Sequence, residues 1–82
     1  MPPADPPPSW VLTRRQQIGA RIRAARRGAR LSQERLGEAT GADRRTISRV
    51  EYGLTDPPLS LLLRIARALD VPLAQLVAGG EE

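Results

Sequence analysis

The 82-residue sequence contains no cysteine and no histidine, and its aromatic residues are limited to Trp10 and Tyr52. Without cysteine, the chain cannot form a disulfide, a thiolate metal site or a thiol nucleophile, and without histidine it lacks the commonest proton shuttle and metal ligand. Two aromatic side chains are too few for a platform on which the bases of single-stranded nucleic acid stack. We therefore predict that the protein is not an enzyme and uses no metal and no cofactor.

Long apolar segments are also missing. No apolar run approaches the length of about 18 residues that indicates a membrane helix, and the N-terminus does not show the basic-then-apolar order of a signal peptide. We expect a soluble, cytoplasmic protein without a membrane partner. A hydrophobic content of 40% over 82 residues is enough for one small domain.

The charge is distributed unevenly along the chain. The formal net charge is +4, every basic residue is an arginine, and residues 14–30 carry seven arginines and no acid. The planar guanidinium fork suits phosphate or guanine, so this bias is compatible with a nucleic-acid partner. A bias in genomic base composition explains the absence of lysine equally well.

The N-terminal segment differs in composition from the rest. Residues 1–9, MPPADPPPS, hold five prolines and almost no apolar surface, which is typical of a flexible arm. Thr13 and Gln16 have the spacing of a capping box that begins a helix. We predict a disordered Pro-rich arm at 1–13, a folded domain at 14–78 and a tail at 79–82. We expect Trp10 to cover the helical core, with an exposed partner contact as the alternative.

The remaining sequence predicts helices separated by clear signals. The first helix ends over residues 28–30, and Ser32 and Asp43 are good N-caps for helices at about 33–40 and 44–52, which Gly41 and Gly53 terminate. A fourth helix spans about 59–69, and a short fifth helix follows "DVPL". We predict an all-α, five-helix domain. Its core includes Ile18, Ile22, Leu36, Ala39, Thr40, Ile65, Leu69 and Leu76.

The segment "TGADRRTISRVEYG" places three arginines on one face of the third helix. Arg44, Arg45 and Arg49 share this face, whereas the apolar residues lie on the other side. Gly37, inside the preceding helix, indicates close backbone approach across the turn at Gly41. Residues 33–52 therefore predict a helix-turn-helix, whose second helix can enter the major groove of DNA. A solvated basic face is the alternative.

At these residues the sequence resembles the phage-repressor and Cro-like helix-turn-helix family, of the xenobiotic-response-element type. The resemblance extends from about Ile18 to Val77, through "LSQERLGEATG", "TISRVEYG" and "LLRIARALDVPLAQL". It implies a compact, lambda-repressor-like domain that acts as a sequence-specific transcriptional regulator by occupying an operator. It also implies double-stranded DNA as the partner, a recognition helix at about 44–52, a homodimer, and association with the nucleoid when bound.

The resemblance also assigns roles to individual residues. The expected base contacts are Arg44, Arg45, Thr46 and Arg49, and the expected phosphate contacts are Gln33 and Ser48. From their position just ahead of the predicted first helix, and not from the resemblance, Arg14 and Arg15 are also expected to contact phosphate or to reach a minor groove. For Arg14 and Arg15, free solvated charges are the alternative. The expected structural residues are Gly37, Gly41, and Arg26 paired with a buried Glu51; an exposed Glu51 is the alternative.

Four departures from the family pattern are visible. Thr40 is polar at a position that is usually apolar. Arg30 stands where glycine is frequent, Pro58 replaces the usual serine cap of the fourth helix, and residues 54–56 supply no basic residue after the recognition helix.

The alternative function is an antitoxin that binds a toxin protein and represses its own gene. We expect dimerisation through the last helix or the Leu61 side of the fourth.

Overall fold

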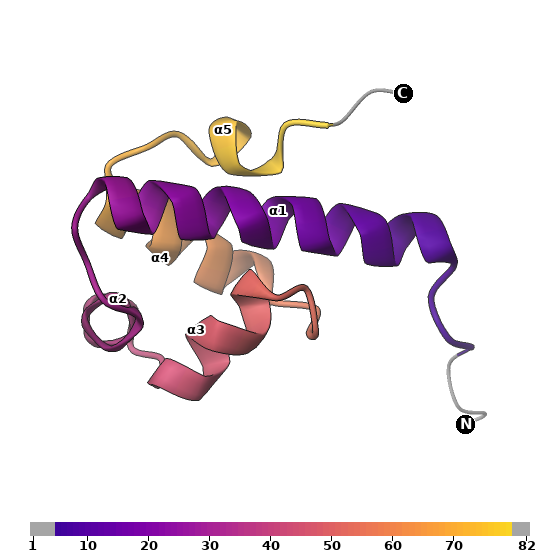
Figure 1. The fold of residues 1–82 in the computed structure, drawn as a ribbon, viewed down its shortest axis with the longest axis horizontal. Coiled ribbons are helices and arrows are strands. Elements are labelled where there is room, and N and C mark those ends of the chain that lie inside the picture. Colours follow the sequence, from indigo (N-terminus) through magenta and orange to yellow (C-terminus); the bar gives the residue numbers. More distant parts are fainter. Residues whose placement is uncertain (1–4, 80–82) are drawn as a thin grey trace.

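The computed structural model describes residues 5–79, which form five α-helices and no strand (Figure 1). The all-α prediction is confirmed. Within this range no helix is both long and apolar enough to cross a membrane. The helices are α1 (Ser9–Gly28), α2 (Gln33–Thr40), α3 (Arg44–Glu51), α4 (Leu59–Leu69) and α5 (Leu73–Val77).

Helix α2 spans the predicted residues, and α3 begins at the predicted Arg44 and ends at Glu51, one residue before the predicted end. Ser32 Oγ accepts a hydrogen bond from the Arg35 N–H at 3.0 Å, and Asp43 Oδ1 accepts one from the Thr46 N–H at 2.7 Å. These side chains satisfy N–H groups that have no partner inside the helix. Gly41 and Gly53 follow the two helices with φ angles of 76° and 72°, the left-handed conformation that glycine adopts without steric cost.

Helix α1 begins earlier than predicted, at Ser9. The Pro8 carbonyl accepts hydrogen bonds from the Val11 and Leu12 N–H groups at 3.0 and 3.3 Å. The fixed φ of proline suits the residue before a helix, and no side chain caps the first turn of α1. The capping box at Thr13 is therefore wrong, and residues 9–13 of the predicted arm belong to α1. Residues 1–4 of that arm and 80–82 of the tail lie outside the described residues.

The prediction for Trp10 is also wrong. Its side chain is 68% exposed and does not cover the core. The reason is the early start of α1, whose N-terminal end projects beyond the other helices in Figure 1. Trp10 is carried on this projecting turn, away from the domain.

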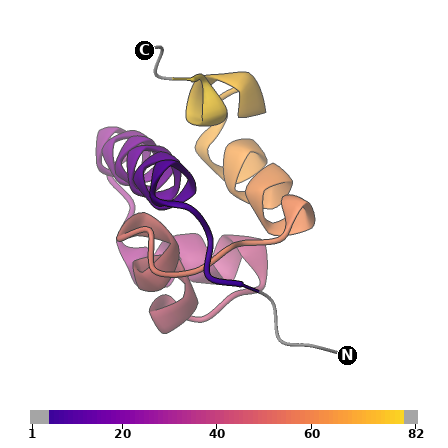
Figure 2. The ribbon, with the colours of Figure 1, turned by 90° about the vertical axis from the view of Figure 1, so that its right-hand side faces the viewer.

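Each helix contributes one fully buried side chain to a common core. These side chains are less than 2% exposed: Ile22, Leu36, Ile47, Ile65 and Leu76. Burial of a side chain of this size stabilises a fold by about 1.5–3 kcal/mol. Figure 1 shows α5 on one side of α1 and the α2–α3 pair on the other, and the view along α1 in Figure 2 places α4 beside both groups. The core thus fixes α3 relative to α1 and α2.

The prediction of Ala39 as a core residue is wrong. Ala39 is exposed, because α2 turns Leu36, Gly37 and Thr40 inward instead. The apolar surface of α4 is only partly covered: Leu59 is 62% and Leu63 is 50% exposed, whereas Leu61 packs against the core. The apolar residues of α4 therefore extend beyond its core contact, and Leu59 and Leu63 form an exposed strip.

Two glycines permit close approach between backbones. A Cβ at Gly37 would lie 2.5 Å from the Ala42 carbonyl oxygen, which confirms the predicted close packing at the α2–α3 turn. A Cβ at Gly19 would lie 2.4 Å from the carbonyl oxygens of Val50 and Glu51. No local pattern indicates this role of Gly19, because the backbone that it approaches is distant in the chain. Both glycines set the position of α3.

Candidate nucleic-acid interface

Helix α3 separates its residues into a buried and an exposed side. Ile47, Val50 and Glu51 are buried, and the three arginines predicted to share one face, Arg44, Arg45 and Arg49, are all exposed. Thr46 and Ser48 are half-buried beside them. We call the exposed side of α3 that carries the three arginines the α3 surface. It is exposed and strongly basic, as is expected of a helix that enters a DNA groove.

A hollow of about 520 Å³ lies along the α3 surface, lined by Gln33, Asp43, Arg44, Arg45, Ser48 and Arg49. Asp43 is the acidic residue of this group. Its hydrogen bonds with Thr46 lower the pKa of the carboxyl, and the charges of Arg45 and Arg49 lower it further. Asp43 is therefore ionised at neutral pH, and its role is to cap α3.

Glu51 and Arg26 form the predicted buried pair. Arg26 is 8% and Glu51 is 4% exposed, and the guanidinium Nε and Nη2 donate to the two carboxylate oxygens at 2.6 and 3.1 Å. Arg26 Nη1 donates to the Leu31 carbonyl at 2.8 Å, so the guanidinium also ties the end of α1 to the following loop. The hydrogen bond with Glu51 raises the pKa of Arg26 above its ordinary value. The alternative of an exposed Glu51 is excluded.

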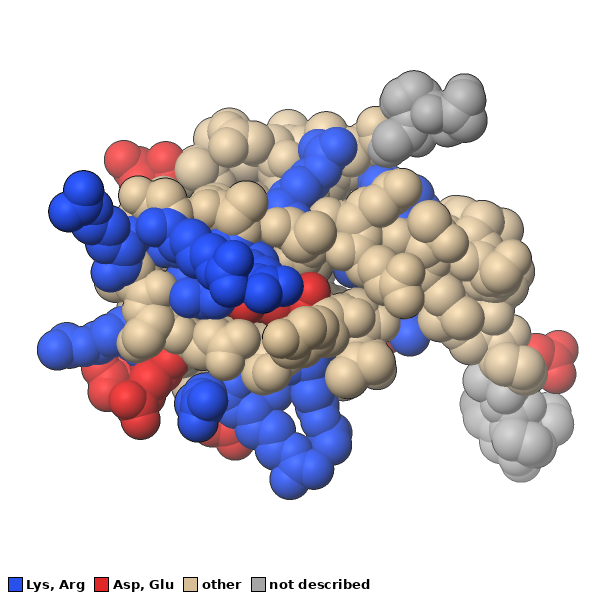
Figure 3. Space-filling view, viewed as in Figure 1, with Lys and Arg blue, Asp and Glu red and all other residues tan. Residues whose placement is uncertain are grey.

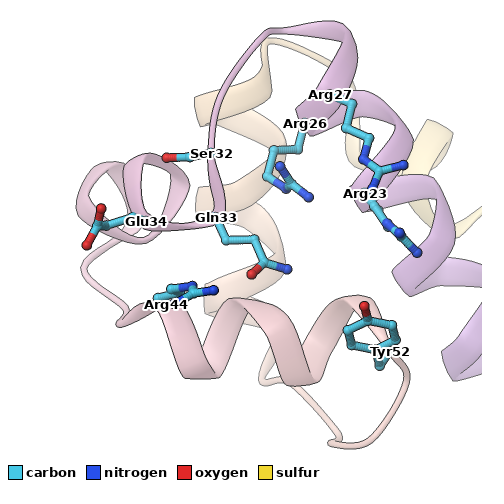
Figure 4. A pocket seen from close by; sticks show the side chains of 8 residues that line it. All are labelled: Arg23, Arg26, Arg27, Ser32, Gln33, Glu34, Arg44 and Tyr52. Carbon is cyan, nitrogen blue, oxygen red and sulfur yellow. The ribbon is translucent and has the colours of Figure 1, made fainter.

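Gln33 joins this pair from the start of α2. Its Nε2 donates to Glu51 Oε1 at 3.1 Å, so the same carboxylate accepts hydrogen bonds from α1 and from α2. The side chain is half-buried and lies between α2 and α3 in Figure 4. The family resemblance predicted Gln33 as a phosphate contact, but its hydrogen bond with Glu51 was not predicted.

A second hollow, of about 490 Å³, runs between α1 and α3, and we call it the α1–α3 groove. It is shown in Figure 4 and is lined by Arg23, Arg26, Arg27, Ser32, Gln33, Glu34, Arg44 and Tyr52. Figure 3 shows arginines gathered over the second half of α1 and over α2 and α3. Arg23, Arg27 and Tyr52 were not predicted as site residues. The available signal was helical spacing, since Arg23 and Arg27 flank Arg26 on α1.

The two arginines at the start of α1 do not join the α3 surface. Arg14 donates to the Val77 carbonyl at 3.0 Å and to Gln17 at 2.7 Å, which places it against the end of α5. Arg15 is half-buried and lines a small apolar cavity with Ile18. Its position three residues before Ile18 puts it on the inward side of α1, which explains this placement.

Comparison with known proteins identifies the family. The model of the helix-turn-helix family matches residues 22–76. Among curated proteins, the chain is 36% identical over 58 residues to y4dL of Sinorhizobium fredii, an uncharacterized HTH-type transcriptional regulator. The alignment covers 71% of this chain but only 30% of that regulator.

Two solved structures are similar in both fold and sequence. The restriction-modification controller protein C.AhdI from Aeromonas hydrophila has a TM-score of 0.72 and 36% identity, over 74% of this chain and 92% of that one. The P22 c2 repressor, crystallised with synthetic operator 9T in the presence of Tl⁺, has a TM-score of 0.73 and 34% identity, over 78% of this chain and 97% of that one.

Proposed function

This chain belongs to the phage-repressor and Cro-like helix-turn-helix family of DNA-binding transcriptional regulators, and on this premise we propose that α3 reads an operator from the major groove. The observation that carries the proposal is the α3 surface, on which Arg44, Arg45 and Arg49 are all exposed. The major groove of B-DNA, about 12 Å wide, admits an α-helix. The protein regulates transcription by occupying its operator in the cytoplasm, without a catalytic step of its own.

Base recognition falls to the arginines of α3, with Thr46 beside them. An arginine can donate to guanine O6 and N7 together, a contact worth about 1–3 kcal/mol of discrimination against the wrong base. We therefore expect guanine-containing half-sites. Asp43 supports this role, because it fixes the first turn of α3 from which Arg44 and Arg45 project.

Backbone contacts come from residues beside α3. Gln33 and Ser48 line the hollow along the α3 surface, and we propose that both hydrogen-bond to phosphates at the edge of the half-site. Arg14 and Arg15 have no part in this proposal, because their side chains are directed to α5 and to an apolar cavity.

A homodimer is part of the proposal, because two half-sites one helical turn apart require two copies of the recognition helix. The exposed strip of Leu59 and Leu63 on α4 is the apolar surface best suited to the contact, in place of Leu61. Sedimentation with and without duplex DNA tests this state. Nothing in the described residues 5–79 or in the similar proteins favours the antitoxin alternative, and we do not propose it.

Selection of binding sites from random duplexes tests the function. We expect enrichment of half-sites with guanine, and Arg49→Ala should relax the preference at one base position at a cost of about 1–3 kcal/mol. Arg67→Ala, an exposed arginine of α4 outside both hollows, is the control with the same charge change. Selection that returns no preferred sequence, or equal losses on every duplex for Arg49→Ala, would contradict sequence-specific reading.

A further inference from the structure

The α1–α3 groove contains more positive charge than its buried ion pair uses. Arg26 is occupied, because its three donor nitrogens contact Glu51 and the Leu31 carbonyl. Arg23 and Arg27 line the same groove, and within residues 5–79 neither forms an ion pair with a carboxylate. Glu34 is the acidic residue of the lining, and in Figure 4 its carboxylate points away from the centre of the groove.

Tyr52 holds Arg23 in place at the end of α3. The guanidinium carbon of Arg23 lies 5.6 Å from the centre of the Tyr52 ring, within the range of a cation–π contact. Stacking of this kind restricts the side chain without using its N–H groups, which remain available to an anion. Tyr52 is 53% exposed and Arg23 is half-buried, so the pair lies at the surface.

The position of the groove indicates which anion it meets. When α3 lies in the major groove, the elements packed along its side face the sugar–phosphate backbone that borders that groove. The second half of α1 is such an element, since the α1–α3 groove follows α3 from Arg44 at its start to Tyr52 at its end. The loop after α3, residues 54–56, carries no basic residue that could bind this strand.

We propose that Arg23, stacked on Tyr52 and assisted by Arg27, is a clamp for one DNA backbone phosphate beside the bases that α3 reads. The inference rests on the proposed function and adds α1 to the DNA-binding surface. The clamp supplies affinity and fixes the register of α3, and it is independent of base sequence. It takes the place of the cation that the loop after α3 lacks.

The salt dependence of binding tests the clamp. Each neutralised phosphate contributes about 0.9 to the slope of log affinity against log salt. We expect Arg23→Ala to reduce the slope by about 0.9, equally on a selected duplex and on a scrambled one, and Arg23→Lys to retain most of it. Arg21→Ala is the matched control, because Arg21 lies on the same helix but contacts the Gln75 carbonyl of α5 at 3.3 Å. An unchanged slope for Arg23→Ala, or an equal change for Arg21→Ala, would overturn the clamp.

Duplexes with single neutral methylphosphonate linkages locate the phosphate. We expect one position at which the neutral linkage weakens the wild type but leaves Arg23→Ala unaffected, with 10 mM inorganic phosphate unable to compete. Competition by phosphate at that level would instead identify a free-anion site and overturn the clamp. Equal weakening of both proteins at every position also overturns it while leaving the proposed function intact. A wild type that binds no duplex removes both proposals.

Discussion

Gln33, the first residue of α2, donates a hydrogen bond from its side-chain Nε2 to Oε1 of Glu51, the last residue of α3, at 3.1 Å. Glu51 also accepts two hydrogen bonds from Arg26, so a single buried carboxylate connects α1, α2 and α3. The residue predicted to contact phosphate is therefore fixed by the same pair that anchors the recognition helix. A change at Glu51 should disturb the stability of the fold and the DNA-binding surface together.

Replacement of Glu51 by alanine should be strongly destabilising. It leaves the Arg26 guanidinium buried without its partner, and loss of one member of a buried ion pair costs about 3–5 kcal/mol. Urea unfolding measures the loss. Glu38→Ala is the control, because its pair with Arg35 is long, at 4.0 Å, and exposed, and such pairs contribute about 0–1 kcal/mol. Losses of similar, small size for both variants would contradict a structural role for the buried pair.

Two glycines of α1 should respond to alanine in opposite directions. At Gly19 a Cβ would clash with two backbone carbonyl oxygens of α3, and overpacking of this kind costs about 1–3 kcal/mol. At Gly28 a Cβ would meet nothing within 4 Å, so Gly28→Ala should stabilise the protein by about 0.5–1 kcal/mol. Thermal melts of the two variants test this contrast. A tolerated Gly19→Ala would show that α1 and α3 are further apart than described.

Replacement of Arg30 by glycine should stabilise the protein. Its φ is 61°, and the hydrogen bonds Arg30 N–H to Arg27 carbonyl and Leu31 N–H to Arg26 carbonyl close the end of α1 around it. Because a left-handed non-glycine residue costs about 1 kcal/mol or more, Arg30→Gly should raise the melting temperature by a few degrees. Ala29→Gly, one residue earlier with a φ of −84°, should lower it instead. A lower melting temperature for Arg30→Gly would refute this explanation.

The cap of α3 should weaken in acid. The hydrogen bonds with Thr46 lower the pKa of Asp43 in the folded protein, so its stabilising effect is present above the ordinary aspartate pKa of about 4. This effect is lost as the pH falls through the lowered value. The melting temperature of the wild type should therefore fall relative to that of Asp43→Asn as the pH drops below about 4. Parallel curves from pH 7 to pH 2 would contradict it.

Local sequence signals predicted most of the fold. Ser32, Asp43, Gly41 and Gly53 fixed the ends of α2 and α3, because capping and left-handed termini depend on only a few neighbouring residues. The prediction for the start of α1 was wrong because it, too, depended on a few neighbouring residues. A capping box at Thr13 was a plausible local signal, but α1 begins after Pro8 without any side-chain cap.

The candidate site was predictable only in part. The helical period placed Arg44, Arg45 and Arg49 on one exposed side of α3, and the family pattern indicated the pair of Arg26 and Glu51. The stacking of Arg23 on Tyr52 was not predictable, because it depends on how α1 crosses the end of α3. That crossing is set by the contact at Gly19, between residues far apart in the sequence.

Titration of a labelled duplex in dilute buffer, followed by fluorescence anisotropy, tests the central claim that the α3 surface binds DNA. The wild type should form a complex. The double variant Arg45→Ala/Arg49→Ala should bind the selected duplex at least about thirtyfold more weakly, since it loses two base contacts that are worth about 1–3 kcal/mol each. Arg35→Ala/Arg67→Ala, with the same charge change at exposed positions outside both hollows, should retain nearly full affinity for that duplex. Absence of a wild-type complex, or equal losses for the two double variants, would contradict the account.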